Sequence, residues 1–122
     1  LGVANQVHLL GYRRDVAELY KAADIDVFPS KREGLGLSAI EGMAAGLPLI
    51  CSDNRGTREY MGRDSLGMVS DCLDYLGFAA AVDRLYRDDK LSAQLGKAAS
   101  KSAERFSVDK INCEMMRIYG LQ

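Results

Sequence analysis

A stretch of strand, glycine-bearing loop and helix constrains this chain more than any other part of its sequence. An apolar run at 25–28 is short enough to be a buried strand, and good helix formers occupy 37–45. Between them, Gly34 and Gly36 permit backbone conformations and a close ligand approach that side chains would obstruct. Gly46 predicts where the helix ends. Because such a turn aims the free amides of a helix N-terminus at the carboxyl end of the strand, the stretch predicts a site for an anionic ligand.

Two carboxylates flank this turn. Glu33 lies in the loop, and Glu41 lies in the second turn of the expected helix. Carboxylates accept paired hydrogen bonds from vicinal hydroxyl groups, such as those of a sugar or a ribose. Taken singly, Glu33 is better explained as a solvent-facing loop residue and Glu41 as a helix surface residue. Because both converge on one loop, we expect a ligand with anionic and polyhydroxyl parts.

Short apolar segments alternate with helical segments along the chain. The expected strands lie at 7–10, 25–28, 47–51 and 66–69. The expected helices lie at 16–23, 37–45, 57–61, 73–88, 91–102 and 107–119. This alternation implies an α/β fold, with an open parallel sheet, helices on both faces and a helical C-terminal third. The length of 122 residues predicts a single domain, 1–122.

The first and last helices carry expected caps and apolar stripes. Asp15 and Ser107 are expected to cap the two helix N-termini. The first stripe, expected to face the core, consists of Val16, Leu19, Tyr20 and Ala23. The last stripe consists of Ile111, Met115, Ile118 and Tyr119. We expect this last stripe to be either core or a docking surface.

Charge and cysteine usage exclude several classes of protein. The net charge is −1 with both signs interspersed, which gives no case for a nucleic-acid partner. No apolar run reaches the length of a membrane span, and no signal peptide is visible. Cys51, Cys72 and Cys113 are odd in number and widely spaced. They are expected to be reduced cytoplasmic thiols, and neither a disulfide framework nor a zinc site.

The central stretch also carries a family resemblance. Residues 29–48 read Pro-Ser-x-x-Glu-Gly-x-Gly-Leu-x-x-x-Glu-x-x-Ala-x-Gly-x-Pro. This string resembles the signature of the retaining group 1 (family four) glycosyltransferases, which have the two-domain GT-B fold. In that family the two glutamates form a Glu-x7-Glu motif, here Glu33 and Glu41. The resemblance runs from about Val7 to the end and covers the second half of the family's C-terminal, donor-binding domain.

The resemblance implies roles for individual residues. Glu33 would be the catalytic residue, close to the donor sugar near the reacting centre. The implied donor-binding residues are Gly34, Leu35, Gly36 and Leu37 at the sugar and diphosphate, Glu41 at the ribose, and Leu10, Gly11 and Tyr12 beside the base. The nucleotide sugar would be a substrate, so no cofactor and no metal are expected.

One loop departs from the family's pattern. After its fifth strand the family usually has Gly-Gly-x-x-Glu, whereas 54–59 here read Asn-Arg-Gly-Thr-Arg-Glu. Gly56 and Glu59 are retained, but Arg55 replaces the first glycine. This replacement weakens any ligand contact inferred for the loop.

The resemblance implies a parent enzyme longer than this chain. That parent would transfer a sugar, with retention, from a nucleotide donor to a hydroxyl of a glycan, lipid or small molecule, in polysaccharide biosynthesis. Its acceptor-binding N-terminal domain and two phosphate-neutralising basic residues lie outside these residues, and the chain begins with Leu1 in place of Met. We therefore expect this piece to be inactive alone, and the parent to be cytoplasmic, with peripheral membrane attachment left open.

Two other classes of function stay open at this point. A non-catalytic subunit that completes a donor site with another polypeptide would be a separate gene with its own start methionine. A different enzyme on a related fold, such as a nucleotide-sugar epimerase or a phosphorylase, would need other groups. The phosphorylase needs a lysine for pyridoxal phosphate, and the epimerase needs a different pattern of acidic residues and histidines.

The resemblance also predicts an open sheet edge. In the family's strand order, 3-2-1-4-5-6, the strands here would be the third to the sixth. The segment 7–10 would lack its neighbour, and 25–28 would expose an unpaired apolar edge of the kind that recruits other strands. We expect 7–10 to pair beside 25–28, or a second copy of the chain to associate through that edge.

Overall fold

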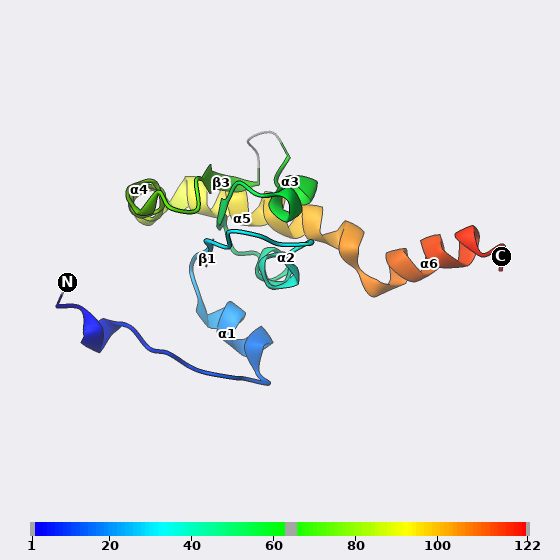
Figure 1. Cartoon of the computed structure of the whole chain (residues 1–122), viewed down its shortest axis with the longest axis horizontal. Coiled ribbons are helices and arrows are strands. Elements are labelled where there is room, and N and C mark those ends of the chain that lie inside the picture. Colours follow the sequence, from blue (N-terminus) through cyan, green and yellow to red (C-terminus); the bar gives the residue numbers. More distant parts are fainter. Residues whose placement is uncertain (1, 63–65, 122) are drawn as a thin grey trace.

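Three parallel strands form the sheet, in the order β1 (Asp26–Phe28), β2 (Leu49–Ser52) and β3 (Gly67–Ser70). The computed structural model describes residues 2–62 and 66–121. The helices are α1 (Val16–Ala22), α2 (Leu37–Ala44), α3 (Arg55–Met61), α4 (Tyr75–Arg87), α5 (Asp89–Ala103) and α6 (Val108–Ile118). Two 3-10 turns, η1 (Ala4–Gln6) and η2 (Glu104–Phe106), complete the elements. The expected α/β class and open parallel sheet are confirmed (Figure 1).

The strand β2 is the centre of the core because side chains on both its faces are covered. Leu49 and Cys51 point to one face, where they pack in a cluster with residues of α2, α3 and α5. Ile50 points to the other face and packs against Phe78 of α4 and Leu95 of α5. Successive residues of a strand point to opposite faces, so helices cover both faces of the sheet, as expected.

The described part of the N-terminal segment differs from its expected structure. Residues 7–10 form no strand in the described chain; they run as an exposed segment outside α1, and Leu9 is 95% exposed. A short strand needs a neighbour for its backbone groups. In the described residues only β2 pairs with β1, and the α1 residues Leu19 and Ala22 line a hollow at the amino end of β1 together with Leu10. Pairing of 7–10 with 25–28 is therefore wrong for this chain, and association with a second copy stays a prediction.

Two local expectations are also wrong. Among the described residues Asp15 makes no capping bond, because its carboxylate accepts hydrogen bonds from the guanidinium of Arg13 instead. These bonds hold the pKa of Asp15 below its usual value. The helix expected to be one turn at 57–61 begins two residues earlier, at Arg55, because Asn54 caps it. The expected stripe of α1 is only partly covered, since no residue of this helix is buried in the described chain.

The last helix presents its apolar stripe to solvent. Ser107 caps α6 as expected, accepting a hydrogen bond from the Lys110 amide. Every residue of α6 is exposed, including Ile111, Met115 and Ile118. The helix projects away from the sheet in Figure 1. The stripe is therefore not part of this chain's core. No helix in the described ranges is long and apolar enough to cross a membrane.

A carboxylate is partly buried at the start of β1. Asp26 lies against the backbone of Gly42 in α2, where an added Cβ would come within 2.2 Å of its Oδ2. This oxygen is buried and has no hydrogen-bond partner among the described residues. Burial disfavours the charged form and raises the pKa of Asp26 from 3.8 to about 6.

We expect Asp26→Asn to raise the free energy of unfolding, relative to the wild type, by more at pH 7 than at pH 4. The pKa of Asp26 is 3.8 in the unfolded chain and about 6 in the folded chain. Between these values the folded chain keeps a proton that the unfolded chain has released, so the free energy of unfolding of the wild type falls as pH rises through this window. The variant should gain about 1–2 kcal/mol on the wild type from pH 4 to 7, because partial exposure reduces the full linkage value.

Urea titrations at both pH values measure this difference. Asp24→Asn, at an exposed neighbouring carboxylate, is the matched control and should keep the wild-type pH dependence. An Asp26→Asn chain whose stability differs from wild type by the same amount at pH 4 and pH 7 would contradict the assignment.

Candidate functional site

The loops that follow β1 and β2 lie side by side at one edge of the sheet. Phe28 pairs with Cys51 in parallel register, so residues 29–36 and 53–54 both leave the sheet at its carboxyl edge. This edge is where open α/β sheets bind ligands. The sequence-predicted loop and the turn after β2 therefore build one candidate site.

Gly36 opens the N-terminus of α2 toward this edge. It is the N-cap residue, with φ +83° in the left-handed region, and among the described residues no side chain caps the helix. An added Cβ would lie 3.0 Å from the Phe28 ring and from the Tyr60 hydroxyl oxygen. Glycine is therefore needed for both conformation and space. The uncapped amides of the first turn can meet an anion.

The other predicted loop residues differ in exposure. Leu35 is half-buried and packs against the main core cluster. Gly34 and Leu37 are exposed. The Leu35 side chain thus anchors the loop to the core, and Gly34 lies at the surface.

The two glutamates lie on opposite sides of α2. Glu33 is half-buried, and its Oε1 accepts a hydrogen bond of 2.8 Å from Ser30 Oγ. It also lies against Gly56 of α3, where an added Cβ would come within 3.0 Å of the Glu33 Cβ. Glu41 is exposed on the α1 side and lines a hollow of about 520 Å³ with Arg14 and Tyr20. One carboxylate thus lies in the loop before α2, and the other lies on the second turn of the helix beside α1.

Tyr20 ties α1 to the first turn of α2. Its hydroxyl donates a hydrogen bond of 2.7 Å to the Ser38 carbonyl oxygen. Burial raises the pKa of Tyr20, and the charges of Asp26 and Glu41 raise it further. The sequence predicted only that Tyr20 faces the core; its polar contact depends on how two helices meet.

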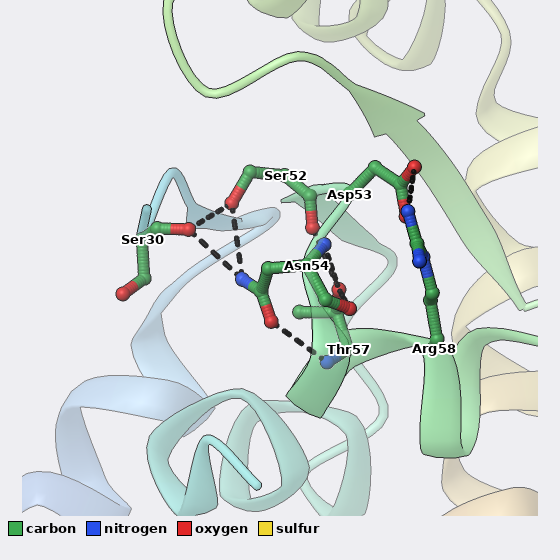
Figure 2. A network of polar contacts seen from close by, with 6 residues as sticks. All are labelled: Ser30, Ser52, Asp53, Asn54, Thr57 and Arg58. Atoms are coloured by element: carbon green, nitrogen blue, oxygen red, sulfur yellow. Dashed lines mark hydrogen bonds and ion pairs between the residues drawn. The ribbon is translucent and has the colours of Figure 1, made fainter. Parts of the chain in front are cut away.

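A buried polar network connects the two loops (Figure 2). Ser52 Oγ and Asn54 Nδ2 both donate hydrogen bonds to the Ser30 carbonyl oxygen, the second over 2.9 Å. Asn54 Oδ1 accepts from the Thr57 amide, and Thr57 Oγ1 accepts from the Asn54 amide, which completes a capping box. Asparagine is among the preferred N-cap residues, so Asn54 itself is a sequence signal for a helix start. From the sequence, Asn54 was expected to lie in a loop before a helix at 57–61.

The loop that departs from the family pattern has a structural role. Gly56 is buried and lets the backbone of α3 approach Glu33 closely. Arg58 forms an exposed ion pair with Asp53, with Nε–Oδ1 at 2.6 Å and Nη2–Oδ2 at 2.9 Å. This ion pair lowers the pKa of Asp53. Arg55 is exposed at the first position of α3.

Tyr60 is a buried polar residue beneath the site. It is 1% exposed, and its hydroxyl has no hydrogen-bond partner among the residues that the structure describes. Its ring meets Phe106 edge to face, with ring centroids 6.2 Å apart. Burial raises the pKa of Tyr60. The apolar pattern of the segment predicted neither the contact with Phe106 nor the burial of the hydroxyl group.

Of the predicted base-binding residues, Leu10 lies at the opposite end of the strands from this loop. Leu10 lines a hollow with Ile25 and Leu47, at the amino ends of β1 and β2. Gly11 has φ +63°, and Tyr12 is 89% exposed. Their proposed contact with a base stays a prediction. In the described ranges no three histidine, cysteine or acidic side chains cluster to hold a metal ion.

Comparisons with known proteins give a consistent result. The family model described as "Glycosyl transferases group 1" matches residues 1–102. EpsD of Bacillus subtilis (strain 168) is 40% identical over 120 residues, which cover 98% of this chain and 32% of that protein. The D-inositol 3-phosphate glycosyltransferase of Xylanimonas cellulosilytica is 34% identical over 114 residues, which cover 93% of this chain and 27% of that protein. The chain thus spans about a third or less of the length of these two relatives.

Solved structures agree with the fold. Sucrose-phosphate synthase from Thermosynechococcus elongatus superimposes with a TM-score of 0.89 at 29% identity, covering 98% of this chain and 31% of that one. Anabaena HepE in complex with UDP and glucose gives a TM-score of 0.92 at 24% identity, covering 99% and 34%. Both matches extend over nearly all of the present chain.

Proposed function

The chain belongs to the group 1 glycosyl transferases, and we propose that it forms part of the donor site of an enzyme that transfers a sugar from a nucleoside diphosphate sugar to an acceptor hydroxyl. In this proposal residues 1–122 are the second half of the donor-binding domain of a GT-B enzyme. The acceptor is a glycan, a lipid or a small molecule, and transfer occurs with retention at the anomeric carbon.

The N-terminus of α2, which has no side-chain cap in the described residues and follows the loop that carries Glu33, supports this proposal. No side chain caps the first turn after Gly36 in the described residues, so the helix N-terminus can receive a diphosphate. Glu33, in the loop before the helix, and Glu41, on its second turn, supply acceptors for the hydroxyl groups of sugar and ribose. HepE, which shares the fold, has been crystallised with UDP-glucose. That complex supports a nucleoside diphosphate sugar as the ligand class.

Each carboxylate has a separate proposed role. Glu33, the catalytic residue of the proposal, lies next to the reacting sugar and stabilises the positive charge that develops there as the diphosphate leaves. Glu41 accepts hydrogen bonds from the ribose hydroxyls. Leu10, Gly11 and Tyr12 border the base once the segment is held by the rest of the enzyme. The donor is consumed as a substrate, and we assign no cofactor.

Donor binding tests this function directly. Calorimetry of the full-length protein with UDP, ADP and GDP should show binding of at least one of them. Turnover of the matching nucleotide sugar should then release that nucleoside diphosphate as a product. Failure of all three nucleotides to bind at millimolar concentration would refute the proposal.

We place the enzyme in the cytoplasm, where the free thiols of Cys51, Cys72 and Cys113 would stay reduced.

We expect Glu41→Ala to weaken nucleoside diphosphate binding by roughly 1–3 kcal/mol, the scale of lost hydrogen bonds to a charged group. Calorimetry with the preferred nucleotide measures the change. Glu18→Ala, at an exposed carboxylate of α1 paired with Lys21, is the control and should bind as the wild type does. Equal affinity of the Glu41 variant and the wild type would leave Glu41 as a surface residue of α2.

A further inference from the structure

The Ser30 carbonyl oxygen is held by two buried donors. Ser52 Oγ donates one hydrogen bond, and Asn54 Nδ2 donates the other over 2.9 Å (Figure 2). Ser52 is fully buried and Asn54 is 8% exposed. A buried donor that loses its acceptor bears a desolvation cost, so such bonds strongly favour a single position of the loop. The backbone of Ser30 is therefore tied to the segment that follows β2.

The same residue contacts the carboxylate of Glu33. Ser30 Oγ donates to Glu33 Oε1 over 2.8 Å. On the other side, the backbone of Gly56 lies against the Glu33 Cβ and carbonyl oxygen, at 3.0 and 3.1 Å from an added Cβ. Gly56 follows Asn54 by two residues in the same capped turn. The segment at 54–56 thus contacts Glu33 directly through Gly56, and indirectly through the bond from Asn54 to Ser30.

We propose that Asn54 is a positioning residue for Glu33, which it holds in place through Ser30. The inference rests on the proposed function, in which the Glu33 carboxylate acts next to the reacting sugar. A group that stabilises charge at a fixed point loses much of its effect when it is displaced by about 1 Å. Removing the tether should therefore lower turnover and leave the backbone amides that bind the diphosphate largely in place.

Asn54→Ser separates the tether from the helix cap. Asn54 uses Oδ1 to cap α3 and Nδ2 to hold Ser30. Serine is an equally good N-cap, but its single side-chain oxygen cannot cap Thr57 and also reach Ser30. Ser30→Ala is the second variant. It leaves the two bonds to the Ser30 carbonyl intact and removes the bond to Glu33, together with a longer bond of 3.4 Å to the Arg32 carbonyl oxygen.

Turnover and donor KM of the full-length protein test the proposal. The readout is UDP release from UDP-glucose, UDP-galactose or UDP-N-acetylglucosamine, whichever the wild type turns over fastest. Asn54→Ser and Ser30→Ala should each lower kcat about tenfold with donor KM within about twofold. Asp53→Ala is the control, because in the described residues the Asp53 side chain bonds only to Arg58, and this variant should retain wild-type kcat. Wild-type kcat in both test variants would overturn the inference.

A double-mutant cycle shows whether Asn54 acts through Glu33. Asn54→Ser combined with Glu33→Gln should have the kcat of Glu33→Gln alone, because one displaced group cannot be lost twice. Multiplicative losses would overturn the inference and leave the proposed function standing. Wild-type kcat in Glu33→Gln alone would instead overturn the catalytic role on which the inference rests.

Hydrogen exchange gives a readout that needs no turnover. Amides of residues 30–36 should exchange at least about fivefold faster in Asn54→Ser than in the wild type, because the loop has lost one anchor. The Asp53→Ala control should exchange like the wild type. Unchanged exchange in Asn54→Ser, in a protein with wild-type unfolding temperature, would show that Asn54 does not hold the loop.

Discussion

Replacing Glu33 with glutamine is expected to lower the kcat of the full-length enzyme about 100-fold, the scale of losing one preorganised electrostatic group. Donor affinity should change by less than about threefold, because the amide still accepts the Ser30 hydrogen bond that holds the side chain. The carboxylate stabilises positive charge only as the transition state forms. Glutamine keeps its shape but not its charge.

Steady-state kinetics together with calorimetry of donor binding separate these two quantities. Glu114→Gln is the matched control, since that glutamate is exposed on α6 and is paired with Arg117. It should retain wild-type kcat. Unchanged turnover in Glu33→Gln would remove Glu33 from the reaction centre, and equal losses in kcat and affinity would make it a donor-binding residue only.

Replacing Gly96 with alanine is expected to destabilise the chain by about 2–3 kcal/mol, as overpacking does. An added Cβ would lie 2.2 Å from the Gly46 carbonyl oxygen, in the turn between α2 and β2. This atom belongs to the backbone and cannot rotate away. Alanine normally favours a helix interior over glycine by about 1 kcal/mol, so the expected change has the opposite sign to the helix propensity.

Urea unfolding followed by circular dichroism measures this change. A loss of 2–3 kcal/mol would be a large part of a total of about 5–15 kcal/mol. Lys97→Ala, at the exposed neighbouring position of α5, is the control and should stay within about 0.5 kcal/mol of the wild type. A stabilised Gly96→Ala chain would show that α5 does not approach the turn this closely.

The local patterns of the sequence predicted the fold class well. Glycines at 36 and 46 marked both ends of α2, and the short apolar runs marked the three strands of the sheet to within a few residues. These signals work because turn chemistry and helix termination depend on residues close together in the chain. The same patterns located the loop between β1 and α2 as the candidate site, and the roles of its residues remain proposals.

The segment at 7–10 shows where local pattern was insufficient. Its residues are as apolar as those of β1, but a strand forms only where another strand offers its backbone groups. In the described residues only β2 pairs with β1, and Leu10 and α1 line one hollow at the amino ends of β1 and β2. The exposed stripe of α6 is a second case, because the same spacing suits a core and a docking surface.

The sequence by itself determined where turns and helix caps could form and how strand and helix segments alternate. It therefore determined the α/β class and the position of the glycine loop with its two carboxylates. Only the tertiary structure decided that Asn54 reaches Ser30, and that Tyr20 reaches Ser38. These bonds join residues 24 and 18 positions apart in the chain. They exist because parallel pairing of β1 with β2 brings two loops to one edge, and packing of α1 on α2 sets one hydroxyl against one carbonyl. No pattern within either segment encodes such a meeting.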